Sequence, residues 1–159
     1  MNNGKRTTEP IIIIRNIVPE DIENIVALER QIFSDPWPQS VFVELLREES
    51  WSVQIAVLNG AIVGYSCYQI DNVKVHLANI AVAIEHRRKL VAQLLLESIL
   101  HQAKENKCEY VFLEVRQSNK KARAFYDKHG FELMYRQKDY YQSPMEDALV
   151  LLRYLNIKD

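Results

Sequence analysis

The amino-acid sequence predicts a mixed α/β domain in which helices cover both faces of one central sheet of about seven strands. Three observations support this prediction. Apolar runs rich in β-branched residues recur along the chain, stretches with apolar residues at helical spacing lie between them, and Asn-Gly, Gly and Pro mark the segment ends. The resulting order is strand, two helices, three strands, helix, strand, helix and two strands, which implies a mixed sheet.

The first third of the chain is expected to form a strand and two helices. Residues 11–17 are rich in β-branched side chains, and Pro19 suits the first turn of a helix. The residues of this first helix that recur at helical spacing are Ile22, Ile25, Val26, Glu29 and Phe33. A second, shorter helix is expected over residues 39–49, with Val41, Phe42, Leu45 and Leu46 as its buried face.

A meander of three strands is expected next, over residues 51–58, 61–70 and 73–82. The first two are joined by Asn59-Gly60, and this dipeptide readily adopts the two positive φ values of a tight hairpin turn. Asp71-Asn72 marks the turn before the third strand.

The second half of the chain alternates helices and strands. A helix over residues 90–105 has Leu94, Leu95, Ile99 and Ala103 on one face. A strand over 110–115 follows, and Asn119 and Gly130 are then the cap and the stop of a further helix. Two last strands, 131–136 and 148–155, are expected to be joined by a loop containing Tyr140, Tyr141 and Pro144.

The length of 159 residues suits one domain with one core, which we expect to span residues 11–155. Residues 1–10 are expected to form a flexible N-terminal segment, and residues 156–159 a short tail. The first ten residues lack the apolar core of a signal peptide, and the apolar run at 11–14 is too short to span a bilayer. A cytoplasmic protein without a membrane partner is therefore expected.

Charge and cysteine content narrow the possible partners. Twenty basic residues against twenty-one acidic ones leave a formal charge of -1, so no global field would attract nucleic acid. Any anionic ligand must be held locally. Cys67 and Cys108 each lie within or at the edge of an apolar run, and two buried thiols used for packing indicate a reducing compartment.

A basic turn before the third helix is the first candidate site. Arg87, Arg88 and Lys89 stand between a strand and a helix N-terminus, where unpaired N–H groups and the helix dipole favour a phosphate group. The alternative for this triplet is a solvated basic turn without a ligand.

The same stretch resembles the strand and pyrophosphate loop of the GNAT acetyltransferases, whose motif is Q/R-x-x-G-x-G/A. Arg87 and Ala92 match the ends of that motif, whereas Leu90 stands where the family has glycine, so its side chain must point away or weaken binding. The resemblance implies acetyl-CoA as acetyl donor. It also implies a sheet splayed between its fourth and fifth strands, so that pantetheine pairs with Ile80, Ala81 and Val82. The remaining implied contacts to the cofactor come from Arg87, Arg88, Lys89, Leu90, Val91, Ala92 and Gln93.

A second stretch is similar to the other half of the cofactor site in this family. It comprises residues 113–119 followed by Ala122, Phe125-Tyr126 and Gly130-Phe131. The resemblance implies that Glu114 is the general base, Tyr126 the general acid, and Asn119 a contact to coenzyme A. The alternatives are that Glu114 forms an edge salt bridge, for example with Arg116, and that Tyr126 is a core aromatic beside Phe125.

Two loops resemble the branch of the family that acetylates the N-terminal alanine of a ribosomal protein. One contains Asp35-Pro36-Trp37, and the other contains Arg136, Tyr140-Tyr141, Pro144 and Glu146-Asp147-Ala148. The resemblance implies that Trp37, Tyr140 and Tyr141 wall a groove for a peptide N-terminus. The alternative is that these aromatic side chains only pack the loops.

The expected activity is therefore acetyl transfer from acetyl-CoA to a protein N-terminal α-amine, by direct attack in a ternary complex of a monomer or weak dimer. The four histidines show no metal-ligand spacing, so no metal is expected. Two other functions stay open: acetylation of a lysine side chain or small-molecule amine, and a non-catalytic GNAT-like binding module.

Overall fold

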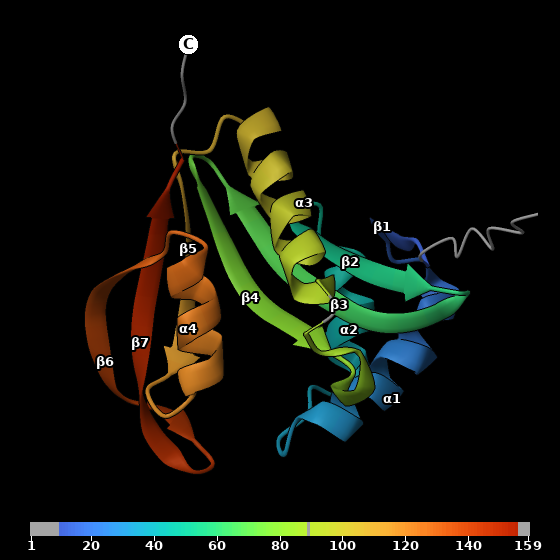
Figure 1. Cartoon of the computed structure of the whole chain (residues 1–159), viewed down its shortest axis with the longest axis horizontal. Helices are drawn as coiled ribbons and strands as arrows, with labels where there is room; N and C mark the ends of the chain where they lie inside the picture. Colours follow the sequence, from blue (N-terminus) through green and yellow to red (C-terminus); the bar gives the residue numbers. More distant parts are fainter. Residues whose placement is uncertain (1–9, 89, 156–159) are drawn as a thin grey trace, which may run out of the picture.

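A computed structural model of the protein describes residues 10–88 and 90–155 (Figure 1). The segment expected at 1–10, apart from Pro10, and the tail expected at 156–159 lie outside the described residues. The elements follow the chain as β1 (Ile12–Asn16), η1 (Pro19–Asp21), α1 (Ile22–Ile32), α2 (Gln39–Leu45), β2 (Trp51–Leu58), β3 (Ala61–Asp71), β4 (Lys74–Val82), η2 (Ile84–His86), α3 (Val91–Glu105), β5 (Tyr110–Arg116), α4 (Lys120–Lys128), β6 (Glu132–Gln142) and β7 (Met145–Tyr154).

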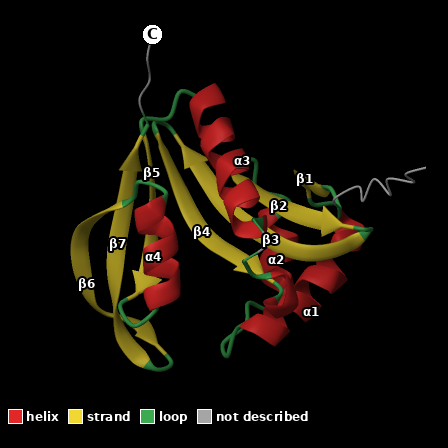
Figure 2. Cartoon of the chain, viewed as in Figure 1, coloured by secondary structure: helices red, strands yellow, loops and turns green. Residues whose placement is uncertain are grey.

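The strands form one seven-stranded sheet in the order β1-β2-β3-β4-β5-β7-β6 (Figure 2). All neighbours are antiparallel except β4 and β5, whose parallel pairing runs only from Lys74–Tyr110 to His76–Phe112. Beyond His76 the two strands diverge, as Figure 1 shows. The prediction of a mixed sheet splayed between its fourth and fifth strands is confirmed.

A bulge in β4 lies where the strands begin to diverge. Cys67 pairs with Asn79 and Tyr68 pairs with Leu77, so Ala78 is an extra residue on β4. Such a residue bends the bulged strand and increases its twist. The bulge therefore helps to turn the end of β4 away from β5.

Helices cover both faces of the sheet, as predicted. In Figure 1, α3 and α4 lie in front of the sheet and α1 and α2 lie behind its β1–β4 half. One buried cluster joins the two halves of the sheet, because it contains Val75 of β4, Val111 of β5, Ile99 of α3 and Tyr126 of α4. Apolar packing at the paired end thus holds the diverging strands in place.

Three predicted boundaries are wrong, one of which is the start of β7, at Met145 and not at residue 148. α2 ends at Leu45 and not at residue 49, because the N–H of Arg47 bonds to Glu44 O in a tighter turn. β6 continues to Gln142, so Tyr140 and Tyr141 lie on a strand and not in a loop. The reason is pairing with β7, where Tyr141 faces Glu146, and a polar sequence without clear alternation did not reveal it.

Other local predictions are confirmed. Gly130 follows α4 with a φ of 79°, and both Cys67 and Cys108 are buried free thiols. Within the part of the chain that the structure describes, no helix is long and apolar enough to cross a membrane.

Gly64 allows α3 to approach the sheet closely. A Cβ atom at this position would lie 2.8 Å from Ala81 O and 3.0 Å from Val91 Cγ1. Substitution of Gly64 by alanine should therefore push α3 away from β3 and β4 and destabilise the fold by about 1–3 kcal/mol. Urea unfolding measures this change.

Gly60→Ala is the matched control for this prediction. Gly60 has a φ of +80°, and a Cβ atom added there would have no neighbour within 4 Å, so its substitution should cost only the backbone strain of about 1–2 kcal/mol. A Gly64→Ala protein as stable as the wild type would contradict the close approach.

Candidate active site

The exposed edge of β4 forms one side of the site. Ile80, Ala81 and Val82 pair with Ser66, Tyr65 and Gly64 of β3, and the ladder to β5 has already ended at His76. Within the described residues, no strand pairs with the β5-facing edge of β4 beyond His76. Backbone N–H and C=O groups along this edge can bind an extended ligand as an additional strand would.

The N-terminus of α3 lies at the end of β4 and is suited to an anion. The cap residue, Leu90, provides no side-chain hydrogen bond, and the first turn contains no acidic residue. The first N–H groups of the helix, those of Val91, Ala92 and Gln93, are therefore available to a ligand. Arg87 and Arg88 are exposed beside them, while Lys89, the third predicted basic contact, lies outside the described residues.

Arg87 helps to hold this turn to the strand that precedes it. Its Nε donates to Val82 O at 3.2 Å, and within residues 10–88 and 90–155 the terminal nitrogen atoms of the guanidinium have no hydrogen-bond partner, so they can bind an anion. The turn thus combines fixed backbone donors with exposed positive charge.

Leu90 adopts the backbone conformation that glycine prefers. Its φ is 63°, in the left-handed region, and its side chain is 64% exposed. The sequence left open whether this side chain would point away, and the structure places it in solvent. A leucine in this conformation costs about 1–2 kcal/mol, so the loop keeps its shape against a local penalty.

Glu114 lies on β5 just beyond the last pair with β4. Its Oε2 is 2.7 Å from Nε2 of His76, and the two side chains are 18% and 28% exposed. The imidazole ring of His76 stacks on Phe112, with centroids 4.6 Å apart. The alternative of an edge salt bridge with Arg116 is not what the structure has, because Arg116 pairs with Glu146 and the contact of Glu114 is with His76.

The pairing of a carboxylate with an imidazole is relevant to proton transfer. Both groups can accept a proton, and a hydrogen bond between them fixes the orientation of each. Sequence reasoning missed His76. A signal in the sequence could have revealed it. His76 lies on β4, three residues before Asn79 at the bulge, and the resemblance already placed this strand next to the strand of Glu114.

Tyr126 reaches the same region from α4. Its side chain packs against Phe125 and Phe131, with ring centroids 5.3 and 5.4 Å apart, so it is a core aromatic as one alternative stated. Burial raises the pKa of its phenol well above the usual range, and the nearby Tyr141 raises it further. The hydroxyl therefore keeps its proton at neutral pH, as a general acid must before it acts.

Tyr140 and Tyr141 stand next to this group on β6. Their rings meet edge to face at 5.0 Å, and burial, together with the charge of Glu114, raises the pKa of both phenols, that of Tyr141 to about 12. The guanidinium of Arg116 lies 4.2 Å from the centroid of the Tyr141 ring. Tyr141 thus lies near both Glu114 and Tyr126.

Trp37 lies in the loop between α1 and α2, and its contacts are mainly to the core. Its ring is 5.9 Å from that of Phe42, and its backbone N–H donates to Oε1 of Glu29 at 2.9 Å. Glu29 is 1% exposed, and Nδ2 of Asn79 on β4 lies 3.5 Å from its other oxygen. Burial raises the pKa of Glu29, while these two donors act in the opposite direction.

Glu29 therefore connects the loop that carries Trp37 to β4, the strand whose unpaired edge forms one side of the site. The sequence placed Glu29 on the buried helix face without assigning it a task. Nδ2 of Asn79 also donates to the hydroxyl of buried Tyr65 at 3.0 Å, so the connection continues into β3. A carboxylate in an otherwise apolar stripe is the signal that could have revealed it.

Asn119 caps α4, as predicted, because its Oδ1 accepts the N–H of Ala122 at 3.1 Å. Its amide nitrogen remains available for a ligand at this helix N-terminus.

One hollow on the molecule does not include the predicted site residues. In residues 10–88 and 90–155, no group of at least three His, Cys, Asp or Glu side chains could hold a metal ion. A hollow of about 480 Å³ lies between α4 and β7, away from the predicted site residues, and is lined by Lys120, Arg123, Ala124, Asp127, Phe131, Leu133, Leu149 and Leu151.

Comparison with known proteins places this arrangement among the acyltransferases. Residues 22–131 match the acetyltransferase (GNAT) family. The chain belongs to this family, as the resemblance in its sequence implied.

Individual relatives agree with the family. An N-alpha-acetyltransferase of Saccharolobus solfataricus is 34% identical over 153 residues, which cover 88% of this chain and 91% of that protein. The ribosomal protein bS18-alanine N-acetyltransferase of Haemophilus influenzae is 31% identical over 146 residues, covering 90% and 99%. The crystal structure of the ribosomal-protein-S18-alanine N-acetyltransferase of Escherichia coli has the same fold, with a TM-score of 0.86, 23% identity and coverage of 94% and 97%.

Replacement of Leu90 by glycine should relieve the left-handed strain and leave affinity for acetyl-CoA unchanged or higher. The gain in stability should be small, roughly 0–1 kcal/mol, because glycine also increases the entropy of the unfolded chain. Calorimetric titration with acetyl-CoA and thermal unfolding measure both effects.

Ile84→Gly provides the control. Ile84 is similarly exposed, at 62%, but its backbone φ is not positive. That variant should only lose stability. A clear loss of acetyl-CoA affinity in Leu90→Gly would mean that the leucine side chain itself contacts the ligand.

Proposed function

We propose that the protein transfers the acetyl group of acetyl-CoA to the N-terminal α-amine of a protein, and that an N-terminal alanine of a ribosomal protein is the preferred acceptor. The observation that carries the proposal is the pair of proton acceptors, Glu114 and His76, positioned where β4 and β5 diverge. The names of the relatives from Saccharolobus solfataricus and Haemophilus influenzae support this choice of acceptor.

Acetyl-CoA is proposed to bind in the opening of the sheet. The edge of β4 at Ile80, Ala81 and Val82 would pair with pantetheine, and the N–H groups from Leu90 to Gln93 would bind the pyrophosphate. Arg87, Arg88 and Lys89 would add positive charge, and Asn119 would contact the cofactor from the N-terminus of α4. Acetyl-CoA would supply an activated thioester, and the protein would orient it.

The residues at the opening are suited to moving two protons. Glu114, supported by His76, accepts the proton of the attacking ammonium group, directly or through a water molecule. The free amine then attacks the acetyl carbonyl carbon and the C–N bond forms. As the C–S bond breaks, the nitrogen loses a second proton, which restores the phenol of Tyr126 after that group has protonated the sulfur. Tyr126, whose phenol is protonated at neutral pH, donates its proton to the departing sulfur.

The acceptor is proposed to lie between the two loops that resemble the ribosomal-protein branch. Tyr140 and Tyr141 would form one wall and Trp37 the other, leaving space for a methyl side chain. An α-amine has a reference pKa of about 8 against about 10.4 for lysine, so less free energy is needed to deprotonate it. The buried free thiols Cys67 and Cys108 fit a reducing compartment, and we place the activity in the cytoplasm.

A panel of peptides tests the acceptor. A peptide with a free N-terminal alanine should be acetylated faster than a peptide with a blocked N-terminus and free lysines, with products located by mass spectrometry. Small-molecule amines belong in the same panel. Equal rates for the blocked peptide would assign the enzyme to lysine side chains.

Replacement of Glu114 by glutamine should lower kcat by about 10²- to 10⁴-fold, because a neutral amide cannot accept the proton of the amine. Affinity for acetyl-CoA should change little, and steady-state kinetics with calorimetry separate the two effects. The control is Glu132→Gln, the same change at an exposed position at the start of β6. Full activity of Glu114→Gln across neutral pH would show that the base lies elsewhere.

A further inference from the structure

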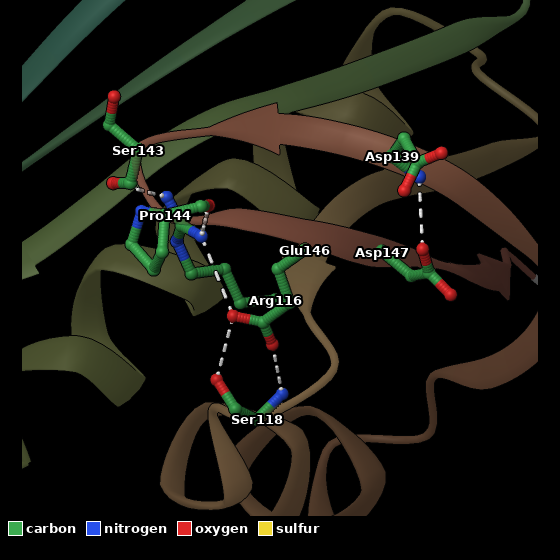
Figure 3. A network of polar contacts seen from close by, with 7 residues as sticks. All are labelled: Arg116, Ser118, Asp139, Ser143, Pro144, Glu146 and Asp147. Carbon is green, nitrogen blue, oxygen red and sulfur yellow. Dashed lines mark hydrogen bonds and ion pairs between the residues drawn. The ribbon is translucent and has the colours of Figure 1, made fainter.

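A carboxylate at the end of the sheet joins the β6–β7 hairpin to the start of α4. Glu146 lies on β7 directly opposite Tyr141, the proposed acceptor contact. Its Oε2 accepts the backbone N–H of Ser118 at 2.6 Å, and its Oε1 accepts the Ser118 hydroxyl at 2.9 Å (Figure 3). Ser118 immediately precedes Asn119, the cap of α4 and the proposed cofactor contact. One side chain therefore lies between both halves of the proposed site.

Arg116 on β5 completes the connection. Its guanidinium donates to Pro144 O at 3.0 Å and to Ser143 O at 3.2 Å, both in the turn of the hairpin, and lies 3.4 Å from Oε1 of Glu146. The same guanidinium contacts the ring of Tyr141. Figure 3 shows Arg116 between the turn and Glu146, with Ser118 on the opposite side of the carboxylate.

The contacts of Glu146 favour its charged form. The hydrogen bonds from Ser118 are the main reason that the pKa of Glu146 is below its usual value, and Arg116 lowers it further. Hydrogen bonds to an ionised acceptor are shorter and stronger than neutral ones, and two donors from one residue also fix direction. At neutral pH the Glu146 carboxylate is therefore ionised, and its two hydrogen bonds with Ser118 hold it in one orientation.

The neighbouring carboxylate, Asp147, has a different set of partners. It accepts the N–H of Asp139 at 2.9 Å and pairs with Arg136 at 3.2 Å, and both partners lie on β6. The side chain of Asp147 therefore stabilises the hairpin internally, whereas Glu146 connects the hairpin to another element. The two acidic side chains are adjacent in the sequence, but only that of Glu146 bonds to the turn before α4.

We propose that Glu146 is a positioning residue that couples the acceptor-binding hairpin to the cofactor-binding turn before α4, so that acceptor and coenzyme A bind cooperatively. The inference rests on the proposed function, because it takes Tyr141 as an acceptor contact and Asn119 as a cofactor contact. Coenzyme A that orders residues 117–119 also orders Glu146 and its cross-strand partner Tyr141. In the same way, an acceptor that orders Tyr141 and Glu146 also orders residues 117–119.

The test measures the dissociation constant of coenzyme A with and without a saturating peptide that begins with alanine. Coenzyme A carries no acetyl group, so the ternary complex forms without turnover. In the wild-type protein the peptide should tighten coenzyme A binding by about fivefold or more, within the usual range of coupling between sites. In Glu146→Gln this factor should fall below about twofold, since one of the two oxygens that accept from Ser118 is replaced by an NH2 group, which is a donor.

Asp147→Asn is the matched control: it removes the same charge from the adjacent position and should keep the wild-type coupling. Ser118→Ala, which removes one of the two hydrogen bonds to Glu146, should give an intermediate factor and serves if Glu146→Gln fails to fold. Unchanged coupling in the folded Glu146→Gln protein, or its complete retention in Ser118→Ala, overturns the proposal. So does a wild-type protein that binds both ligands independently.

Failure of the proposed function has a different signature. In that case the wild-type protein would not bind coenzyme A, or would not acetylate the peptide, before any variant is compared. Loss of coupling in Asp147→Asn as well as in Glu146→Gln would assign the effect to general loosening of the hairpin and would also overturn the specific role of Glu146.

Discussion

The short parallel pairing of β4 and β5 is the constraint on which the rest of the site depends. The ladder ends at His76 and Phe112, and the bulge at Ala78 turns β4 away immediately afterwards. Apolar packing around Ile99 and Val111 keeps the paired end closed. The unpaired edge of β4, the His76–Glu114 contact and the N-terminus of α3 all follow from the position at which this pairing stops.

Each side of the opening is supported by a carboxylate that accepts a backbone N–H group. Glu29 accepts from Trp37 and Glu146 accepts from Ser118. Their environments differ, because Glu29 is almost completely buried and its pKa is raised, while Glu146 faces strong donors and its pKa is lowered. In both cases the carboxylate orders a segment next to the proposed reacting groups, and Glu114 is left as the carboxylate suited to proton transfer.

The loop before α3 shows that backbone shape can be retained when the usual residue is absent. Leu90, at the position where the family has glycine, has a left-handed backbone, and Gly64 lets the first turn of α3 approach β3 and β4. The position of the helix N-terminus is therefore set by packing beneath the helix. Leu90 only has to adopt the resulting φ and direct its side chain into solvent.

The sequence alone determined the order of elements, the caps at Asn119 and Gly130, the hairpin at Asn59-Gly60 and the candidate pair Glu114 and Tyr126. The order of elements, the caps and the hairpin are local, so short-range preferences are sufficient for them. The pair Glu114 and Tyr126 is what the resemblance to the family over about twenty residues implied. Only the tertiary structure decided that Glu114 meets His76, 38 residues away, and that Glu29 meets Asn79, 50 residues away. It also placed Tyr140 and Tyr141 on a strand, opposite β7. Such contacts depend on strand order and on where two strands diverge, and periodicity within one segment carries no information about either.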